Sequence, residues 1–295
     1  EACTNNKYQV EYYWQNTTDD KFTLYETDTY NNGVTGATVT ALEKVYTGLK
    51  LDKSVAGTVA SGTVTPDGKL VLKLYYIRNT YTVEYKYESA VSGAPTLPTT
   101  KTYRFGQTVN VADDAVLEHY NFRGWYTKSA AFHVTTGMSS FQMPAENLTL
   151  WGEFKRIEGV HYKVEHYLMD ANGNYSAPIL TEEFEDGIAG ETVTGTPKKA
   201  SADDRFAGYV HDPAAAGSVL SGTVVASTDP YYPLTLKLYY KPGTYRVIYE
   251  YVGILPANRS PLPAAADAIY MSEVTVAPDA TADGYTFSGW TIQSP

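Results

Sequence analysis

The chain has 295 residues, 43% of them hydrophobic and 19% charged, so it can build packed cores and is too apolar for a disordered chain. Acidic residues outnumber basic ones by 33 to 23, and the net charge of -10 would repel a phosphate backbone, which argues against nucleic-acid binding. The 27 tyrosines and 23 glycines are typical of strands and turns and predict a β-dominated fold.

Cys3 is the only cysteine in the sequence, which excludes an intrachain disulfide and a cysteine-based zinc site. The scarcity of cysteine fits either the cytosol or the exterior of a Gram-positive bacterium. No apolar run approaches the roughly 18 residues that a membrane-spanning helix needs, and no charged segment precedes a short apolar one. We therefore expect any signal peptide or wall anchor to lie outside these residues.

One phrase that begins with tyrosine occurs four times, at intervals of roughly 80 residues. Its copies are Tyr8-Gln-Val-Glu-Tyr12, Tyr81-Thr-Val-Glu-Tyr85, Tyr162-Lys-Val-Glu-His166 and Tyr245-Arg-Val-Ile-Tyr249. Such an interval is enough for one small domain and too long for one turn of a solenoid. After a leader at 1–7, the sequence thus predicts four modules, which we name A1 (8–79), B1 (80–157), A2 (158–243) and B2 (244–295).

Two module types alternate along the chain, as their shared segments indicate. These are Leu70–Tyr76 and Leu234–Tyr240 in type A, and Phe122-Arg-Gly-Trp125 and Phe287-Ser-Gly-Trp290 in type B. B2 stops before any counterpart of residues 143–154, so we expect it to be truncated or completed differently. The joints between modules are short, which predicts modules in contact and an elongated rod.

Hydrophobic periodicity predicts the elements within a module. In A1, alternation places Tyr8, Val10, Tyr12 and Trp14 on one face of a half-buried opening strand. In A2, the turn-forming segment Asp170-Ala-Asn-Gly-Asn174 precedes a second strand, which predicts an opening hairpin. In B1, residues 112–119 have helical spacing with Asp113 as the N-cap, which predicts one short helix over the sheet.

These signatures resemble two families of repeats from Gram-positive surface proteins. Type A resembles the mucin-binding protein (MucBP) repeat in its Tyr-x-Val-x-Tyr opening, its turn, its Gly36–Ala41 segment and its closing Leu-x-Tyr-Tyr. Type B resembles the internalin B-repeat, also called the Listeria-Bacteroides repeat, in Phe122–Tyr126, Met143-Pro-Ala and Leu148–Phe154. The resemblance implies a β-rich α+β fold, a tandem array of small β-grasp-like (ubiquitin-like) modules, and an extracellular place on the bacterial surface, wall-anchored or secreted.

The topology implied by the resemblance makes the first and last strands of a type A module parallel neighbours. Alternation then puts Glu11 beside Lys73 and Tyr13 beside Tyr75 on an outward, solvated face. The same arrangement in A2 comprises Glu165, Tyr167, Lys237 and Tyr239. Surface solubility alone is the alternative reason for lysine and glutamate at these positions.

No catalytic or cofactor motif stands out, and we predict neither an enzyme nor a bound cofactor or metal. His161 and His166 are five residues apart on one predicted strand, which points them to opposite faces and argues against a shared metal ion. The acidic pairs at 19–20, 113–114 and 203–204 leave calcium binding open, but solvated loops are the simpler reading. An isopeptide crosslink also stays open, although no specific lysine is marked for it.

Two functions fit this pattern. The first is a segment of a surface adhesin whose modules contact host mucin, glycan or glycoprotein, and the second is a stalk that projects a distal binding domain. Candidate contact residues are Tyr13, Trp14, Tyr75, Tyr167 and Tyr239. Trp125 and Trp290, each beside a glycine, are expected to fill cores. We expect a monomer with no nucleic-acid partner.

Overall fold

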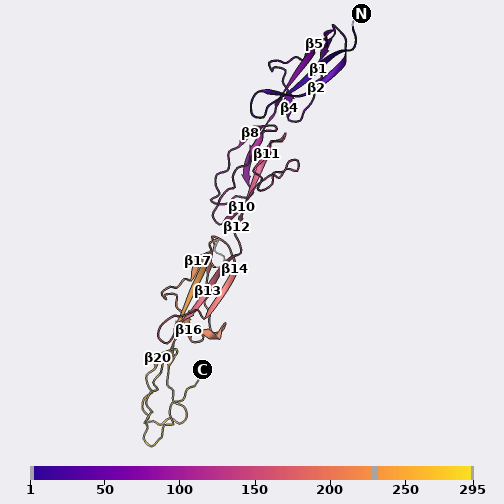
Figure 1. Ribbon diagram of the computed structural model, residues 1–295. Helices are drawn as coiled ribbons and strands as arrows, with labels where there is room; N and C mark the ends of the chain where they lie inside the picture. Colours follow the sequence, from indigo (N-terminus) through magenta and orange to yellow (C-terminus); the bar gives the residue numbers. More distant parts are fainter. Residues whose placement is uncertain (1–2, 227–231, 294–295) are drawn as a thin grey trace. The chain divides into compact units, whose positions relative to one another are not determined.

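The computed structural model describes residues 3–226 and 232–293 (Figure 1), and the chain divides into two compact units, 1–155 and 156–295. Strands dominate both units. Helical structure in the described residues is limited to one 3-10 turn, Asp204–Phe206. The predicted β-dominated fold is confirmed, whereas the helical part of the predicted α+β class has no counterpart in these residues.

Module A1 is built around two parallel strands from its opposite ends. Its strands are β1 (Asn6–Gln15), β2 (Phe22–Gly33), β3 (Thr38–Thr40), β4 (Leu49–Leu51), β5 (Ser61–Thr63) and β6 (Leu70–Arg78). The main sheet has the order β2-β1-β6-β4, in which β1 and β6 are parallel and both outer strands are antiparallel to their neighbours. β3 and β5 form a separate antiparallel pair. The first and last strands of the module are therefore neighbours, as predicted.

The core of A1 lies on the face of the sheet that alternation predicts. Val10 and Tyr12 of β1 are buried, and so are Leu72, Leu74 and Tyr76 of β6. Each fully buried side chain of this size stabilises the fold by about 1.5–3 kcal/mol. These five residues lie on one face of the sheet because successive side chains of a strand point to opposite faces.

Module A2 repeats this sheet in the second unit. Its strands are β13 (Val160–Leu168), β14 (Leu180–Gly187), β15 (Thr192–Thr194), β16 (Tyr209–His211), β17 (Ser221–Thr223) and β18 (Leu234–Pro242). The order is β14-β13-β18-β16, again with a central parallel pair. The predicted hairpin is confirmed: β14 runs antiparallel to β13, and the turn is closed by a hydrogen bond from Asp170 N to Asn174 O.

Module B1 places its first strand against its last. Its strands are β7 (Thr80–Tyr87), β8 (Lys101–Arg104), β9 (Thr108–Asn110), β10 (Tyr120–Tyr126), β11 (Ser140–Gln142) and β12 (Leu148–Arg156). The sheet has the order β10-β12-β7-β8, with β12 parallel to β7, while β9 pairs with β11. Trp125 is buried in the core with Val83, Val109 and Leu150, as predicted.

The helix predicted over residues 112–119 is wrong. The segment has no regular secondary structure up to a turn at its end. Its polar backbone groups bond to side chains instead: Ala112 N donates to Tyr85 Oη, and Trp125 Nε1 donates to the carbonyl oxygen of Asp113. Val116, which helical spacing would turn toward the sheet, is exposed. Hydrogen bonds to side chains that are distant in sequence therefore override the helical periodicity of this segment.

Module B2 has less regular structure than B1. Its strands are β19 (Thr244–Val247) and β20 (Ala266–Ile269), which pair antiparallel. The rest of the described part of B2 is drawn as loops in Figure 1. Among the described residues, β19 therefore has a partner on one edge only.

Candidate functional site

A built joint connects A1 to B1 within the first unit. Asn79 N donates to the carbonyl oxygen of Gly48 (2.9 Å), and Phe105 N donates to the carbonyl oxygen of Asn79 (2.9 Å). The ring of Phe105 lies directly against Gly48, so a Cβ atom at position 48 would stand 2.2 Å from it. Gly48 of A1, Asn79 at the end of A1 and Phe105 of B1 are thereby held together.

The same joint occurs between A2 and B2 in the second unit. Gly243 N donates to the carbonyl oxygen of Gly208 (2.8 Å), and Tyr270 N donates to that of Gly243 (2.8 Å). A Cβ atom at Gly208 would stand 2.5 Å from the ring of Tyr270. Gly208 also has a positive φ of 81°, as Gly48 has 76°, a conformation that glycine adopts without strain. The joint is thus a repeated device that requires a glycine and an aromatic ring.

Polar contacts reinforce the first joint. Arg78 donates from Nη1 to the carbonyl oxygen of Phe105 (2.8 Å) and from Nε to that of Gln15 (2.6 Å). Arg104 of B1 pairs with Asp20 of A1 and donates to the carbonyl oxygen of Asp19 (2.5 Å). Burial lowers the pKa of Arg78, and the neighbouring Arg104 lowers it further, although an arginine remains charged.

The outer face of the A1 sheet carries the predicted ladder. Glu11 lies opposite Lys73 and Tyr13 opposite Tyr75 in the parallel register of β1 and β6. The two tyrosine rings are stacked at 4.8 Å, and Tyr13 Oη donates to Glu11 Oε2 (2.6 Å). This hydrogen bond, together with burial, raises the pKa of Tyr13 to about 12. The predicted topology and register are confirmed.

In A2 the corresponding face is buried rather than solvated, which corrects the prediction. Tyr167 and Tyr239 stack at 4.8 Å, and both rings are only 9% exposed. Tyr175 packs edge-on against Tyr239, and Val219 forms an antiparallel bridge with Lys237. The ladder of A1 is covered in a similar way, since Phe22 packs edge-on against Tyr75 and Val59 bridges Lys73, but Tyr13 and Tyr75 remain half-buried there.

An aromatic patch in A1 went unnoticed in the sequence. Tyr25 stacks on Trp14 at 3.5 Å, and Tyr46 contacts both rings edge-on. Tyr25 is 54% exposed, so one face of this stack is open to solvent. Trp14 was a predicted contact residue, whereas Tyr25 was not. Tyr25 is left without a register partner on β2, where the pairing with β1 shifts between Tyr12 and Tyr13, so alternation does not predict where its ring lies. A binding role for Tyr13, Trp14, Tyr75, Tyr167 and Tyr239 remains a prediction.

A histidine replaces a core tyrosine in A2. His166 takes the position of Tyr12 and is fully buried between Tyr240 Oη and Glu182 Oε2, each 2.9 Å from a ring nitrogen. Lys198 Nζ donates to the other carboxylate oxygen of Glu182 (2.6 Å). Burial lowers the pKa of His166, and the carboxylate of Glu182 opposes this shift.

Protein donors bond to one carboxylate in two of the three acidic pairs that the sequence left open for calcium, Asp19 and Asp203. Asp19 accepts from Asn16 and Lys21, and Asp203 accepts from Arg205. Within the described ranges, no group of three or more histidine, cysteine or acidic side chains is placed to hold a metal ion. No helix in that part of the chain is long and apolar enough to cross a membrane.

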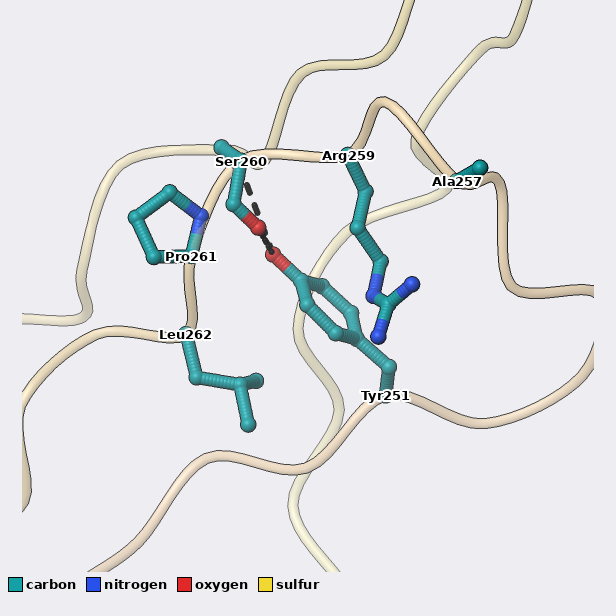
Figure 2. Close-up of a pocket in the computed structure, with 6 residues that line it drawn as sticks. All are labelled: Tyr251, Ala257, Arg259, Ser260, Pro261 and Leu262. Carbon is teal, nitrogen blue, oxygen red and sulfur yellow. Dashed lines mark hydrogen bonds between the residues drawn. The ribbon is translucent and has the colours of Figure 1, made fainter.

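A shallow cavity of about 320 Å³ lies in B2, lined by Tyr251, Ala257, Arg259, Ser260, Pro261 and Leu262 (Figure 2). Tyr251 Oη donates to the carbonyl oxygen of Ser260 (2.9 Å), and the guanidinium of Arg259 lies over the tyrosine ring at 5.7 Å.

Comparisons with known proteins identify the type B segments. Residues 81–151 and 245–294, together less than half of the chain, match the Listeria-Bacteroides repeat domain, which confirms the resemblance of both B modules. No curated protein matches the chain. The chain is similar to the Streptococcal High Identity Repeats in Tandem (SHIRT) domains 3-4 from a cell surface protein, with 14% identity over 52% of this chain and 98% of that one and a TM-score of 0.19. It is also similar to the Bacillus anthracis TIE protein, with 11% identity over 81% of this chain and 51% of that one and a TM-score of 0.33.

Proposed function

We propose that this chain is a non-catalytic segment of an extracellular bacterial surface protein and acts as a spacer that holds its modules in series. The observation that carries this proposal is the repeated joint. Gly48 with Phe105 and Gly208 with Tyr270 make the same ring contact and the same two backbone hydrogen bonds. A flexible linker would need neither an aromatic ring packed against a glycine nor a glycine of fixed φ.

Small-angle scattering tests the spacer. Compact modules of about 80 residues are roughly 30 Å across, so four held in series should reach a maximum dimension of ~120 Å. The Gly48→Ala, Gly208→Ala double variant should keep its modules folded and show a broader distribution of dimensions. A wild-type particle that is nearly spherical, or a variant as stiff as the wild type, would contradict the proposal.

We also propose a second function, contact with host mucin, glycan or glycoprotein through the patch of Trp14, Tyr25 and Tyr46. The observation that favours it is the open ring of Tyr25, since stacked aromatic rings offer a flat apolar surface with polar edges. Tyr46 Oη hydrogen-bonds to Glu26, which places a carboxylate at the rim. A glycan and mucin array probed with the full chain tests this function without assuming a ligand.

We further propose that A1 and A2 are MucBP-like repeats and that all four modules belong to the β-grasp-like class. Their support is the central parallel pair, which joins the first and last strands in both type A modules with the same register. Anchoring to the cell wall would place the spacer between the wall and any binding domain carried beyond it.

A further inference from the structure

The patch of Trp14, Tyr25 and Tyr46 presents aromatic rings and a carboxylate together. Tyr25 is the extra residue of β2 where the pairing with β1 shifts, and its ring stacks on Trp14 at 3.5 Å. An extra residue of this kind re-aims a side chain. The next residue, Glu26, accepts a hydrogen bond from Tyr46 Oη, and the ring of Tyr46 contacts both other rings of the patch. The carboxylate of Glu26 therefore lies at the edge of the aromatic stack.

The fold of a type A module does not require this arrangement. Module A2 has the same strand order and the same central parallel pair without it. Leu168 takes the register position of Trp14, and Leu180 takes that of Glu26. An exposed aromatic stack that one copy of a fold has and the other lacks indicates a binding surface rather than a packing requirement.

The charges at the edge of the patch are mainly acidic. Lys44 Nζ lies 3.2 Å from Glu26 Oε1 and 2.8 Å from Asp28 Oδ2, so its ammonium is shared between two carboxylates. The same ammonium lies 4.2 Å from the centroid of the Tyr12 ring. Two carboxylates against one ammonium leave this cluster with an excess of negative charge. An anionic group placed over the rings would therefore be repelled.

We infer that the patch binds a neutral sugar of the galactose type, at the end of a host glycan, and rejects the same sugar when it carries an anionic group. This inference rests on the proposed contact with mucin, glycan or glycoprotein. The axial hydroxyl of galactose leaves one face of the sugar with C–H groups only, and this face would lie flat on the exposed ring of Tyr25. Hydroxyls at the edge of the sugar would donate to the carboxylate of Glu26.

Saturation-transfer NMR on the full chain tests the preference with lactose and with lactose sialylated on its galactose. Saturation should reach the galactose C–H protons of lactose and should be lost in Tyr25→Ala. Lactose should bind about two- to fivefold more tightly than sialyllactose, because the added carboxylate meets the negative excess at the patch. In about 1 M salt, where the Debye length is about 3 Å, the two affinities should converge.

A change of charge within the patch tests the cause of the preference. Glu26→Gln leaves Asp28 balanced by Lys44, so it should bring the affinities for the two sugars closer together. Glu183→Gln is the matched control, because it removes an exposed carboxylate from β14 of A2 and should leave the preference unchanged.

The outcomes separate the sugar preference from the proposed contact with glycans. Equal or tighter binding of sialyllactose, or a preference that neither salt nor Glu26→Gln changes, would overturn the preference for a neutral sugar and leave glycan contact standing. No saturation of lactose, or saturation that persists in Tyr25→Ala, would overturn the galactose site. A glycan and mucin array without any bound glycan would overturn glycan contact itself.

Discussion

In module A1, Nζ of Lys73 lies 3.6 Å from Oε2 of Glu11, across the central parallel pair. In A2 the equivalent glutamate keeps the tyrosine contact, because Glu165 accepts from Tyr167 Oη (2.5 Å), but its paired lysine is Lys163 (2.7 Å) on its own strand. Burial opposes the ionisation of Glu165, but these two hydrogen bonds hold the pKa of its carboxyl below the usual value.

A double-mutant cycle with Glu11→Gln and Lys73→Met should give a coupling free energy of about 0.2–1 kcal/mol, because the pair is partly exposed and screened by water. Amide exchange in β1, followed as a function of urea concentration, gives the free energy of unfolding of A1 for each variant. The cycle with Glu165→Gln and Lys237→Met serves as the control and should give a smaller coupling, since Lys163 takes the direct contact. A larger coupling in A2 than in A1 would contradict this account.

Gly48→Ala should loosen the joint between A1 and B1. Gly36→Ala is a matched control, because Gly36 has a φ of 78° close to the 76° of Gly48, while no atom lies within 4 Å of its position. Both variants should lose about 1–2 kcal/mol from the left-handed backbone, but only Gly48→Ala displaces Phe105. Faster exchange of the Asn79 and Phe105 amides in Gly48→Ala alone is the expected result, and equal exchange in both variants would count against the joint.

Met271→Gly should stabilise the second joint. Met271 has a φ of 66°, which costs a side-chain-bearing residue about 1–2 kcal/mol, and its counterpart in B1 is Gly106, with a φ of 73°. The gain should be about 0.5–1 kcal/mol, because glycine also raises the entropy of the unfolded chain. Thermal unfolding of the second unit measures it, and a lower midpoint would mean that the hydrogen bond from Tyr209 Oη to Met271 Sδ is worth more than the strain.

The stability of A2 should fall as the pH drops below 6.5. Burial lowers the pKa of His166 below its usual 6.5, so the unfolded chain binds a proton before the folded chain does. Stability is therefore present above pH 6.5 and is lost as the pH falls toward the folded pKa. Glu182, Lys198 and His211 surround the ring, and burial lowers the pKa of His211 in the same direction.

The A1 sequence supplies the control for this prediction. His166→Tyr combined with Glu182→Asp restores the pair that Tyr12 and Asp28 form in A1, where Tyr12 Oη donates to Asp28. Urea midpoints of A2 between pH 7 and 5 should fall less in this double variant than in the wild type. An unchanged slope would assign the pH dependence to His211.

Tyr25→Ala should abolish binding to any mucin or glycan found on the array and leave the stability of A1 nearly unchanged. The ring is more than half exposed, so its removal deletes a contact surface rather than a core residue. Tyr285→Ala, which removes a similarly exposed ring from B2, is the control. If Tyr25→Ala retained binding and Tyr285→Ala lost it, the binding site would lie in B2 and the proposed patch would be wrong.

The parts of the fold that depend on local alternation could be predicted from the sequence. The opening phrase places Val10 and Tyr12 inward, and the near-identity of Leu70–Tyr76 and Leu234–Tyr240 indicates one shared strand register. The helix over 112–119 could not be rejected locally, because the hydroxyl of Tyr85 that holds Ala112 is distant in sequence.

The joint and the patch escaped prediction for a related reason. Gly48 and Phe105 belong to different modules, and nothing in either segment marks them as partners until the backbone brings them together. Tyr25 lies opposite the region where β1 shifts register, so simple alternation misplaces its neighbours.

The parallel pairing of first and last strands has a mechanical consequence. A pull on the two ends of A1 loads β1 and β6 in opposite directions along their length, so the seven residue pairs from Tyr8–Leu70 to Trp14–Tyr76 must slide together in shear. An antiparallel terminal hairpin would instead open one hydrogen bond at a time. Each type A module thus contains a clamp suited to tension, and single-molecule stretching should record A1 and A2 yielding at higher force than B2, whose β19 shares only a short pairing with β20.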